Sequence, residues 1–356
     1  MKKIILYLSL SFAFDAQAND VSTVPIEERP SAAAEPSEAK VKEVSLSKGI
    51  IQDSTQPSEF GKLSYIPKEG VGYADIEYSS STVSAKLSRL GNTLADIKSN
   101  SNSFGYLLGF GITDSFSMGL QGRVYTASSN DYSYGPGSTV NGTSENYLSS
   151  GPTDPRLLFS WRIRDNAQRK TKADFAFGFR PKIQVDKSAS ATKNGNMAAG
   201  RNEYMLNLNF FKEINNLEIQ LSAQRNQYAA GKSEDVSDTT KTSETSEYGS
   251  SEFQFKGMAR VSESMMFGGG LNINNTEVYN NESYTNGVKG STTQSGSLLL
   301  TSIEVEARVL LDDKAMFKLT VNSLLGATGV VKSGTTTFDY TINSGVNIAG
   351  AWVQEF

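Results

Sequence analysis

Apolar side chains occupy every second position between residues 104 and 126. The pattern runs through two segments: Phe104, Tyr106, Leu108, Phe110 and Ile112, and then Phe116, Met118, Leu120 and Val124. Successive side chains of a β-strand point to opposite faces, so a period of two predicts two strands. Residues 113–115 between them leave room only for the turn of an antiparallel hairpin.

The same alternation recurs from residue 70 to the end of the chain. We expect twelve strands, near residues 70–79, 93–112, 115–126, 154–164, 172–186, 202–213, 216–228, 250–261, 264–275, 295–311, 314–329 and 338–356. Short connections are expected at 113–115, 165–171, 214–215, 262–263 and 312–313, and long ones at 80–92, 127–153, 187–201, 229–249, 276–294 and 330–337. Short and long connections alternate, which is typical of an outer-membrane barrel with both chain ends in the periplasm. Residues 70–356 are therefore expected to form one all-β, antiparallel transmembrane β-barrel.

A soluble β-sandwich also alternates, because its core face is apolar and its outer face polar. The length of the strands, the regular alternation of turns and loops, and Trp161 and Trp352 near expected strand ends favour the membrane barrel. The last strand ends in Phe356, with Trp352 on the same face. We interpret Trp352 and Phe356 as a signal for the barrel-assembly machinery.

The first eighteen residues indicate a secretory signal peptide. Two lysines precede an apolar run, and Ala16 and Ala18 form a small-residue cleavage site; a short buried helix is the alternative. Residues 19–69 are rich in Pro, Glu, Ser and Ala, so we expect a mostly disordered periplasmic extension. The alternative is a functional arm, with a short amphipathic helix over 39–51, that plugs the barrel, binds a partner or orders an oligomer.

The composition excludes several classes of function. The chain has no cysteine and no histidine, so thiol and imidazole chemistry and most zinc sites are absent, and we expect no enzyme, metal or cofactor. Its 34 basic and 38 acidic residues give no basic footprint for nucleic acid. After the N-terminus no apolar run is long enough for a transmembrane helix.

If the apolar face meets lipid, the alternate face lines the lumen. The charged residues expected there are Arg123, Arg156, Arg162, Arg164, Arg180, Lys182, Glu218, Glu252, Lys256, Arg260, Glu304, Glu306, Arg308 and Lys318, joined by Asp75 and Glu77 on the first strand. The arginines of the third to fifth strands suggest a basic wall that faces a more acidic wall across a narrow pore. The alternative is that these charges pair and fill a closed lumen.

The segments GFGITDSFSMGL and GPTDPRLLFSWRI resemble a pattern in bacterial outer-membrane transport barrels of the MetA-pathway-of-phenol-degradation type. The resemblance covers residues 105–163 and extends to the remainder in architecture. It implies a porin-like channel, or passive uptake of small solutes.

Three functions are compatible with these patterns. We expect a porin-like channel or passive transporter in the bacterial outer membrane, surrounded by outer-membrane lipids. The alternative is a structural barrel with a plugged lumen that acts through lipid, a partner or its surface loops, with homo-oligomer formation left open. A barrel enzyme ranks last, because we identify no catalytic constellation.

Overall fold

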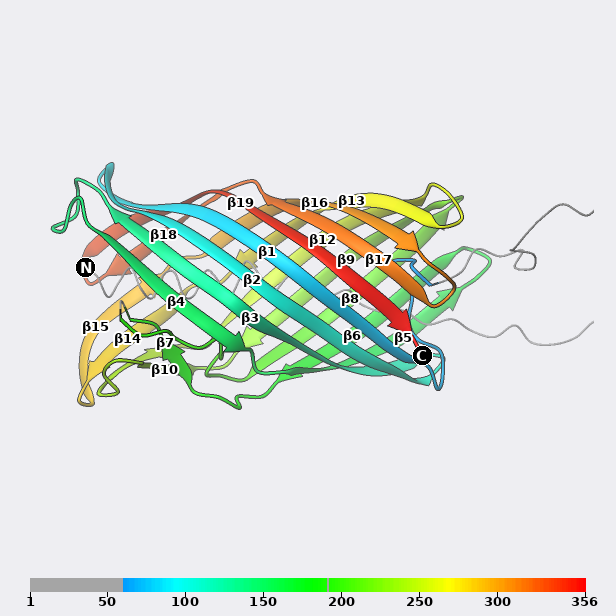
Figure 1. Ribbon diagram of the computed structural model, residues 1–356, viewed down its shortest axis with the longest axis horizontal. Coiled ribbons are helices and arrows are strands. Elements are labelled where there is room, and N and C mark those ends of the chain that lie inside the picture. The colour runs from blue at the N-terminus through cyan, green and yellow to red at the C-terminus, as the bar shows by residue number, and fades with distance from the viewer. Residues whose placement is uncertain (1–59, 191) are drawn as a thin grey trace, which may run out of the picture.

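The first and last strands of the chain pair with each other and close the sheet into a barrel. In this computed structural model, β1 (Gly72–Arg89) and β19 (Thr336–Glu355) are antiparallel from Tyr73 opposite Glu355 to Ser88 opposite Asp339. Backbone hydrogen bonds of 2.9 and 3.0 Å join Gly72 to Phe356 beyond this ladder. A closed sheet has no exposed edge. We call the end of the barrel at Gly72 and Phe356 the terminal end and the opposite end the distal end (Figure 1).

In the described part of the chain, nineteen strand segments form the twelve long strands of the barrel wall, which we call staves whether they are continuous or interrupted. The uninterrupted staves are β1, β2 (Asn92–Thr113), β3 (Phe116–Tyr134), β8 (Glu203–Ile214) and β19. The other staves are each built of two segments: β4 (Ser144–Pro152) with β5 (Arg156–Asn166), β6 (Thr171–Arg180) with β7 (Asp186–Ser188), β9 (Leu217–Tyr228) with β10 (Gly231–Asp235), β11 (Lys241–Thr245) with β12 (Tyr248–Arg260), β13 (Met265–Thr276) with β14 (Tyr279–Thr285), β15 (Val288–Ser295) with β16 (Leu298–Leu310), and β17 (Ala315–Leu324) with β18 (Ala327–Ser333). The pairing is antiparallel except for a short parallel ladder between β7 and β10. The predicted fold class is confirmed.

The structure describes residues 60–190 and 192–356. The expected signal peptide with its cleavage residues Ala16 and Ala18, the expected disorder of the extension and the amphipathic helix over 39–51 lie outside this range. Among the described residues, no helix is long and apolar enough to cross a membrane.

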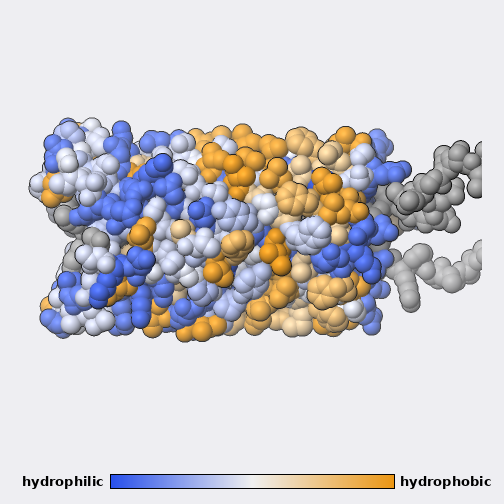
Figure 2. All heavy atoms as spheres, in the orientation of Figure 1, coloured by the Kyte–Doolittle hydropathy of each residue, from blue (hydrophilic) through white to orange (hydrophobic). Residues whose placement is uncertain are grey.

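Large apolar side chains cover the outside of the barrel in one belt toward the terminal end (Figure 2). On β2 the belt runs from Phe104 to Ile112, and the intervening residue Leu107 points inward and is buried. Exposed apolar residues of the neighbouring staves continue it: Ile76, Tyr78, Leu120, Leu157, Trp161, Leu206, Leu208, Phe210, Leu221, Phe253, Phe255, Phe267, Leu271, Ile303, Val305, Phe317, Leu319, Val346, Ile348 and Trp352. The expected outward face of these strands is therefore the observed one.

Beyond the belt, toward the distal end, the apolar face changes sides. On β1 the exposed apolar residues Ile76 and Tyr78 are followed by the buried Ala85 and Leu87, which point inward. The inward face here is an apolar cluster with Ile97, Tyr132, Leu298 and Phe338 from other staves. Outward positions such as Ser80 and Thr82 are polar. This part of the barrel has the hydrophobic inside and polar outside of a water-soluble barrel.

Most of the segments that were expected to be long loops are strands of this distal part of the barrel. Residues 80–89 continue β1, and Leu90 and Gly91, with φ of 50° and 79°, form a two-residue hairpin turn. Strands also fill most of 127–153, 229–249 and 276–294. These segments were expected to be loops because they are rich in Ser, Thr, Asn, Gly and Asp. The five expected short turns, all at the terminal end, are confirmed.

Asp186 lies in the ladder between β7 and β10 at the distal end. Its carboxyl group makes the stability of this ladder depend on pH. Burial raises the pKa of Asp186 to about 7, although Arg201 and Lys182 act in the opposite direction. The folded protein holds the proton up to about pH 7, whereas an unfolded chain releases it near pH 4. The stability of the ladder should therefore decrease as the pH rises from about 4 to about 7, and then level off.

Asp186→Asn should remove this dependence, because an amide does not ionise. Hydrogen exchange of the β10 amides between pH 4 and 8, corrected for intrinsic rates, measures the effect. Asp238→Asn is the matched control, since Lys241 and Thr240 lower the pKa of Asp238 to about 2, below the tested range. An unchanged pH slope in Asp186→Asn would contradict the prediction.

Candidate functional site

The inward face of the barrel is arranged in layers from the terminal to the distal end. The inward side chains of β16, read toward the distal end, are Leu310, Arg308, Glu306, Glu304, Ser302 and Leu300. The stave β1 repeats the order with Tyr73, Asp75, Glu77, Ser79, Ser81 and Val83. An apolar layer is thus followed by a charged layer, by a layer of hydroxyl and amide groups, and by the distal apolar cluster.

The terminal apolar layer is filled by residues 60–66, which precede β1 and which we call the inner segment. Phe60, Leu63 and Ile66 are each at most 5% exposed. Phe60 and Leu63 join the inward-pointing Met258, Met266, Met316 and Val353 in one cluster. Gly61 has a φ of +91°, and a Cβ there would lie 2.9 Å from Leu310 Cδ2. The inner segment therefore occupies the lumen near the terminal end, which is one of the roles considered for the extension.

Charged side chains of the wall hold the backbone of the inner segment. The Glu218 carboxylate accepts hydrogen bonds from the N–H groups of Leu63, at 2.5 Å, and Ser64, at 3.1 Å. Arg308 donates to the carbonyl oxygens of Gly61 and Lys62, and Arg162 donates to that of Ser64 at 2.8 Å. Buried hydrogen bonds to charged groups are among the stronger ones in proteins. The inner segment is thus fixed through its main chain.

The charged layer consists of buried ion pairs, which here join staves that are separated by one intervening stave. Lys256 on β12 pairs with Glu304 and, at 2.7 Å, with Glu306 on β16. Glu306 also accepts from Arg308 Nε, at 2.5 Å. On the adjoining part of the wall, Lys318 pairs with Asp75 at 3.3 Å. Charges withdrawn from water need such partners, because an unpaired buried ion is strongly unfavourable.

A glycine on the intervening strand allows Lys256 to reach its partners. Gly270 on β13 lies between Lys256 and Glu304 in the register of the sheet. A Cβ at Gly270 would lie 3.3 Å from the Cβ of Lys256 and 2.5 Å from the Phe255 carbonyl oxygen. Close approach of neighbouring strands thus explains part of the glycine run 268–270.

Four of the five arginines of the expected basic wall also meet a carboxylate. Arg123 pairs with Glu77 at 3.0 Å, and both Arg156 and Arg180 pair with Glu203, at 3.2 and 2.5 Å. Arg162 forms a bidentate ion pair with Asp174 and also pairs with Asp165. The structure therefore does not show a basic wall opposite an acidic one. Opposite charges on adjacent strands, or on strands two apart in the sheet, neutralise each other locally, which corresponds to the pairing alternative.

Two of the expected lumen charges point elsewhere. Arg164 is exposed, because a register irregularity between Arg162 and Arg164 changes the alternation at the end of β5. Lys182 is exposed in the irregular stretch between β6 and β7. Arg260 is half-buried at the terminal end, where it donates to the Glu263 carbonyl oxygen. The remaining expected lumen charges lie on the inward face, and Trp352 and Phe356 point outward, 47% and 72% exposed.

Sequence reasoning missed three groups of lumen residues. Glu203 and Asp174 have the inward parity of their strands and could have been found by extending the alternation. The inner segment was assigned to the extension, although its FGKLSYI sequence is more apolar than the residues before it. The amide residues of the lumen were not considered as a group, because asparagine was interpreted as a loop residue.

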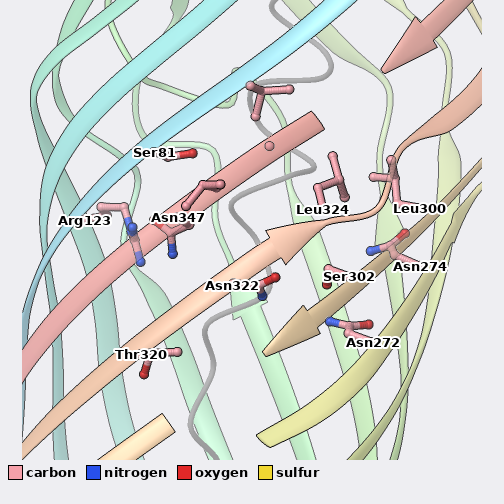
Figure 3. Close-up of a pocket in the computed structure, with 13 residues that line it drawn as sticks. Ser81, Arg123, Asn272, Asn274, Leu300, Ser302, Thr320, Asn322, Leu324 and Asn347 are labelled. Atoms are coloured by element: carbon pink, nitrogen blue, oxygen red, sulfur yellow. The ribbon is translucent and has the colours of Figure 1, made fainter. Parts of the chain in front are cut away.

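Amide and hydroxyl side chains line a pocket in the lumen, between the charged layer and the distal apolar cluster. Figure 3 shows them converging from several staves, with Arg123 at one side and Leu300 and Leu324 at the other. The polar residues are Ser81, Asn272, Asn274, Ser302, Thr320, Asn322 and Asn347. We call these the amide layer. It can exchange hydrogen bonds with a solute without adding charge.

Comparisons with known proteins identify the fold. No family model matches the chain, and no curated protein sequence matches it. The crystal structure of the COG4313 outer membrane channel from Pseudomonas putida F1 is similar with a TM-score of 0.52 and 15% identity, over 86% of this chain and 100% of the channel. A mutant of the TodX monoaromatic hydrocarbon channel gives 0.42 and 8%, over 84% and 93%, and the protease OmpT from Escherichia coli gives 0.37 and 11%, over 80% and 97%. The first similarity shows that the fold is that of an outer-membrane barrel.

Proposed function

We propose that this protein is an outer-membrane channel that lets small solutes cross passively, with both chain ends on the periplasmic side. The observation that carries the proposal is the two-sided character of the belt strands, which are apolar outside and polar inside within a closed sheet. On β2 the apolar stretch from Phe104 to Ile112 spans nine residues. At about 3.3 Å per residue and a tilt of about 40°, it covers about 23 Å, close to the apolar height of outer-membrane barrels.

The layers of the lumen support a narrow and selective route. The charged layer is neutralised by pairing, and the amide layer on its distal side offers uncharged donors and acceptors. The inner segment would act as a movable stopper at the periplasmic side, since it is joined to the wall by hydrogen bonds and apolar packing. Lipid chains are the proposed partners of the belt, and Trp352 and Phe356 are proposed to be recognised by the assembly machinery.

A second function is favoured by the same inner segment. If residues 60–66 never leave the lumen, the protein would be a structural barrel that acts through its outer surface. Refolding the purified protein into planar bilayers and liposomes distinguishes the two. We expect discrete current steps and passage of small solutes. A folded barrel, verified by heat-modifiable gel mobility, that carries no current and passes no solute would favour the structural function.

A further inference from the structure

We propose that the amide layer is a binding site for a small uncharged solute with several hydroxyl groups, such as a polyol or a monosaccharide. The inference rests on the proposed channel function and specifies its class of solute. It is drawn from the unsatisfied hydrogen-bonding groups of the layer, from the neutrality of its surroundings and from its one apolar wall.

Two buried acceptors of the amide layer lack a hydrogen-bond partner in the described part of the chain. Asn272 and Asn274 are 3% and 4% exposed, and the Oδ1 atom of each is buried without a donor. The Nδ2 group of Asn272 donates to Glu252 Oε1 at 2.6 Å, which leaves its Oδ1 as the free acceptor. Buried acceptors are nearly always paired in folded proteins, so these two atoms select a ligand that supplies donors.

The electrostatics of the site favour an uncharged ligand. The guanidinium group of Arg123, at one side, pairs with Glu77 and donates to the hydroxyls of Ser79 and Ser103. Toward the terminal end, Lys318 is paired with Asp75. An anion entering the layer would lose its hydration without meeting an unpaired cation, and the Glu252 carboxylate that borders the layer already accepts a hydrogen bond from Asn272. A hydroxyl group loses less hydration free energy than an ion does, and it can donate hydrogen bonds to the Oδ1 atoms of Asn272 and Asn274.

The distal side of the pocket supplies apolar contact. Val83, Leu300 and Leu324 line it there. A polyol or sugar has both hydroxyl groups and C–H surfaces, so it can use the amide and the apolar sides together. A purely apolar solute would leave the Oδ1 atoms of Asn272 and Asn274 without a hydrogen-bond donor, so the layer does not favour it.

Liposome swelling with the whole refolded barrel tests the inference. The probes are xylitol, which is uncharged and carries hydroxyl donors, and glycine betaine, a zwitterion of similar size that carries separated charges and no donors. We expect the wild-type barrel to pass xylitol faster. The double variant Asn272→Leu, Asn274→Leu should slow xylitol by about tenfold, because two hydrogen bonds between uncharged groups are lost, which are weaker than those to a carboxylate, and leave betaine unchanged. Asn275→Leu, an exposed amide on the same strand, is the matched control and should change neither rate.

Heat-modifiable mobility shows whether the double variant has folded. If it has not, the single change Asn274→Ser, which shortens the side chain and keeps it polar, should still slow xylitol by about threefold. Equal wild-type rates for the two probes, or an unchanged xylitol rate in the folded variants, would overturn the inference while the channel function stands. A wild-type barrel that passes neither probe and carries no ion current would instead overturn the channel function, and the inference with it.

Discussion

Glu218→Ala is expected to raise the ratio of open to closed time in single-channel recordings by about thirtyfold. The Glu218 carboxylate accepts hydrogen bonds from the N–H groups of Leu63 and Ser64 in the closed lumen. Without it, these two groups find acceptors only when the inner segment moves into water. A loss of about 1 kcal/mol for each hydrogen bond amounts to about thirtyfold in the equilibrium.

Two further variants make this experiment specific. Glu218→Gln keeps one acceptor atom and should give an intermediate ratio. Glu203→Gln changes a buried carboxylate that bonds Arg156 and Arg180, so it should leave the open time near the wild-type value. If Glu218→Ala opens no more often than the wild type, residues 60–66 are a fixed part of the wall, and the stopper role is wrong.

The belt could be predicted from the sequence because each of its residues carries the information locally. Phe104, Leu108 and Phe110 alternate with small or inward residues, and the turn after them is only long enough for a hairpin. Hydrophobic alternation thus defines the strand, and the apolar parity defines the face that meets lipid. The observed strand pairs and terminal turns follow from this information.

Much of the distal half, including residues 80–89, could not be predicted in the same way. Between Tyr78 and Val83 of β1, the apolar residues change from the outward to the inward face without an interruption of the strand. Alternation reports that one face is apolar, but not whether lipid or the interior lies against it. A search for segments whose apolar residues keep one parity therefore ends the first strand at the edge of the belt, as in the expected strand 70–79.

The ion pairs of the lumen depend on register, which composition does not contain. Lys256 meets Glu304 because Gly270 lies between them and has no side chain. Arg164 turns outward because a single irregularity follows Arg162. The residue types of the charged layer could be predicted from parity, whereas the identity of each partner required the pairing of strands that are distant in sequence.

Lys256→Met should lower the free energy of unfolding by about 3–5 kcal/mol. Lys256 is buried between the carboxylates of Glu304 and Glu306, and methionine keeps most of its volume without the charge. Glu306 retains Arg308 at 2.5 Å, but Glu304 loses its cation inside the lumen. Urea titration of the barrel refolded in lipid vesicles measures the loss.

The same variant should make the ion current more selective for cations, because the charged layer gains one uncompensated negative charge. The reversal potential in a KCl gradient reports this shift. Lys182→Met is the matched control: it removes the same charge from an exposed position outside the lumen, and should change stability by at most about 0.5 kcal/mol and leave selectivity unchanged. Similar effects of the two changes would mean that selectivity follows the total charge of the barrel. An effect confined to Lys256→Met would mean that ion selectivity is set by the paired charges of the lumen.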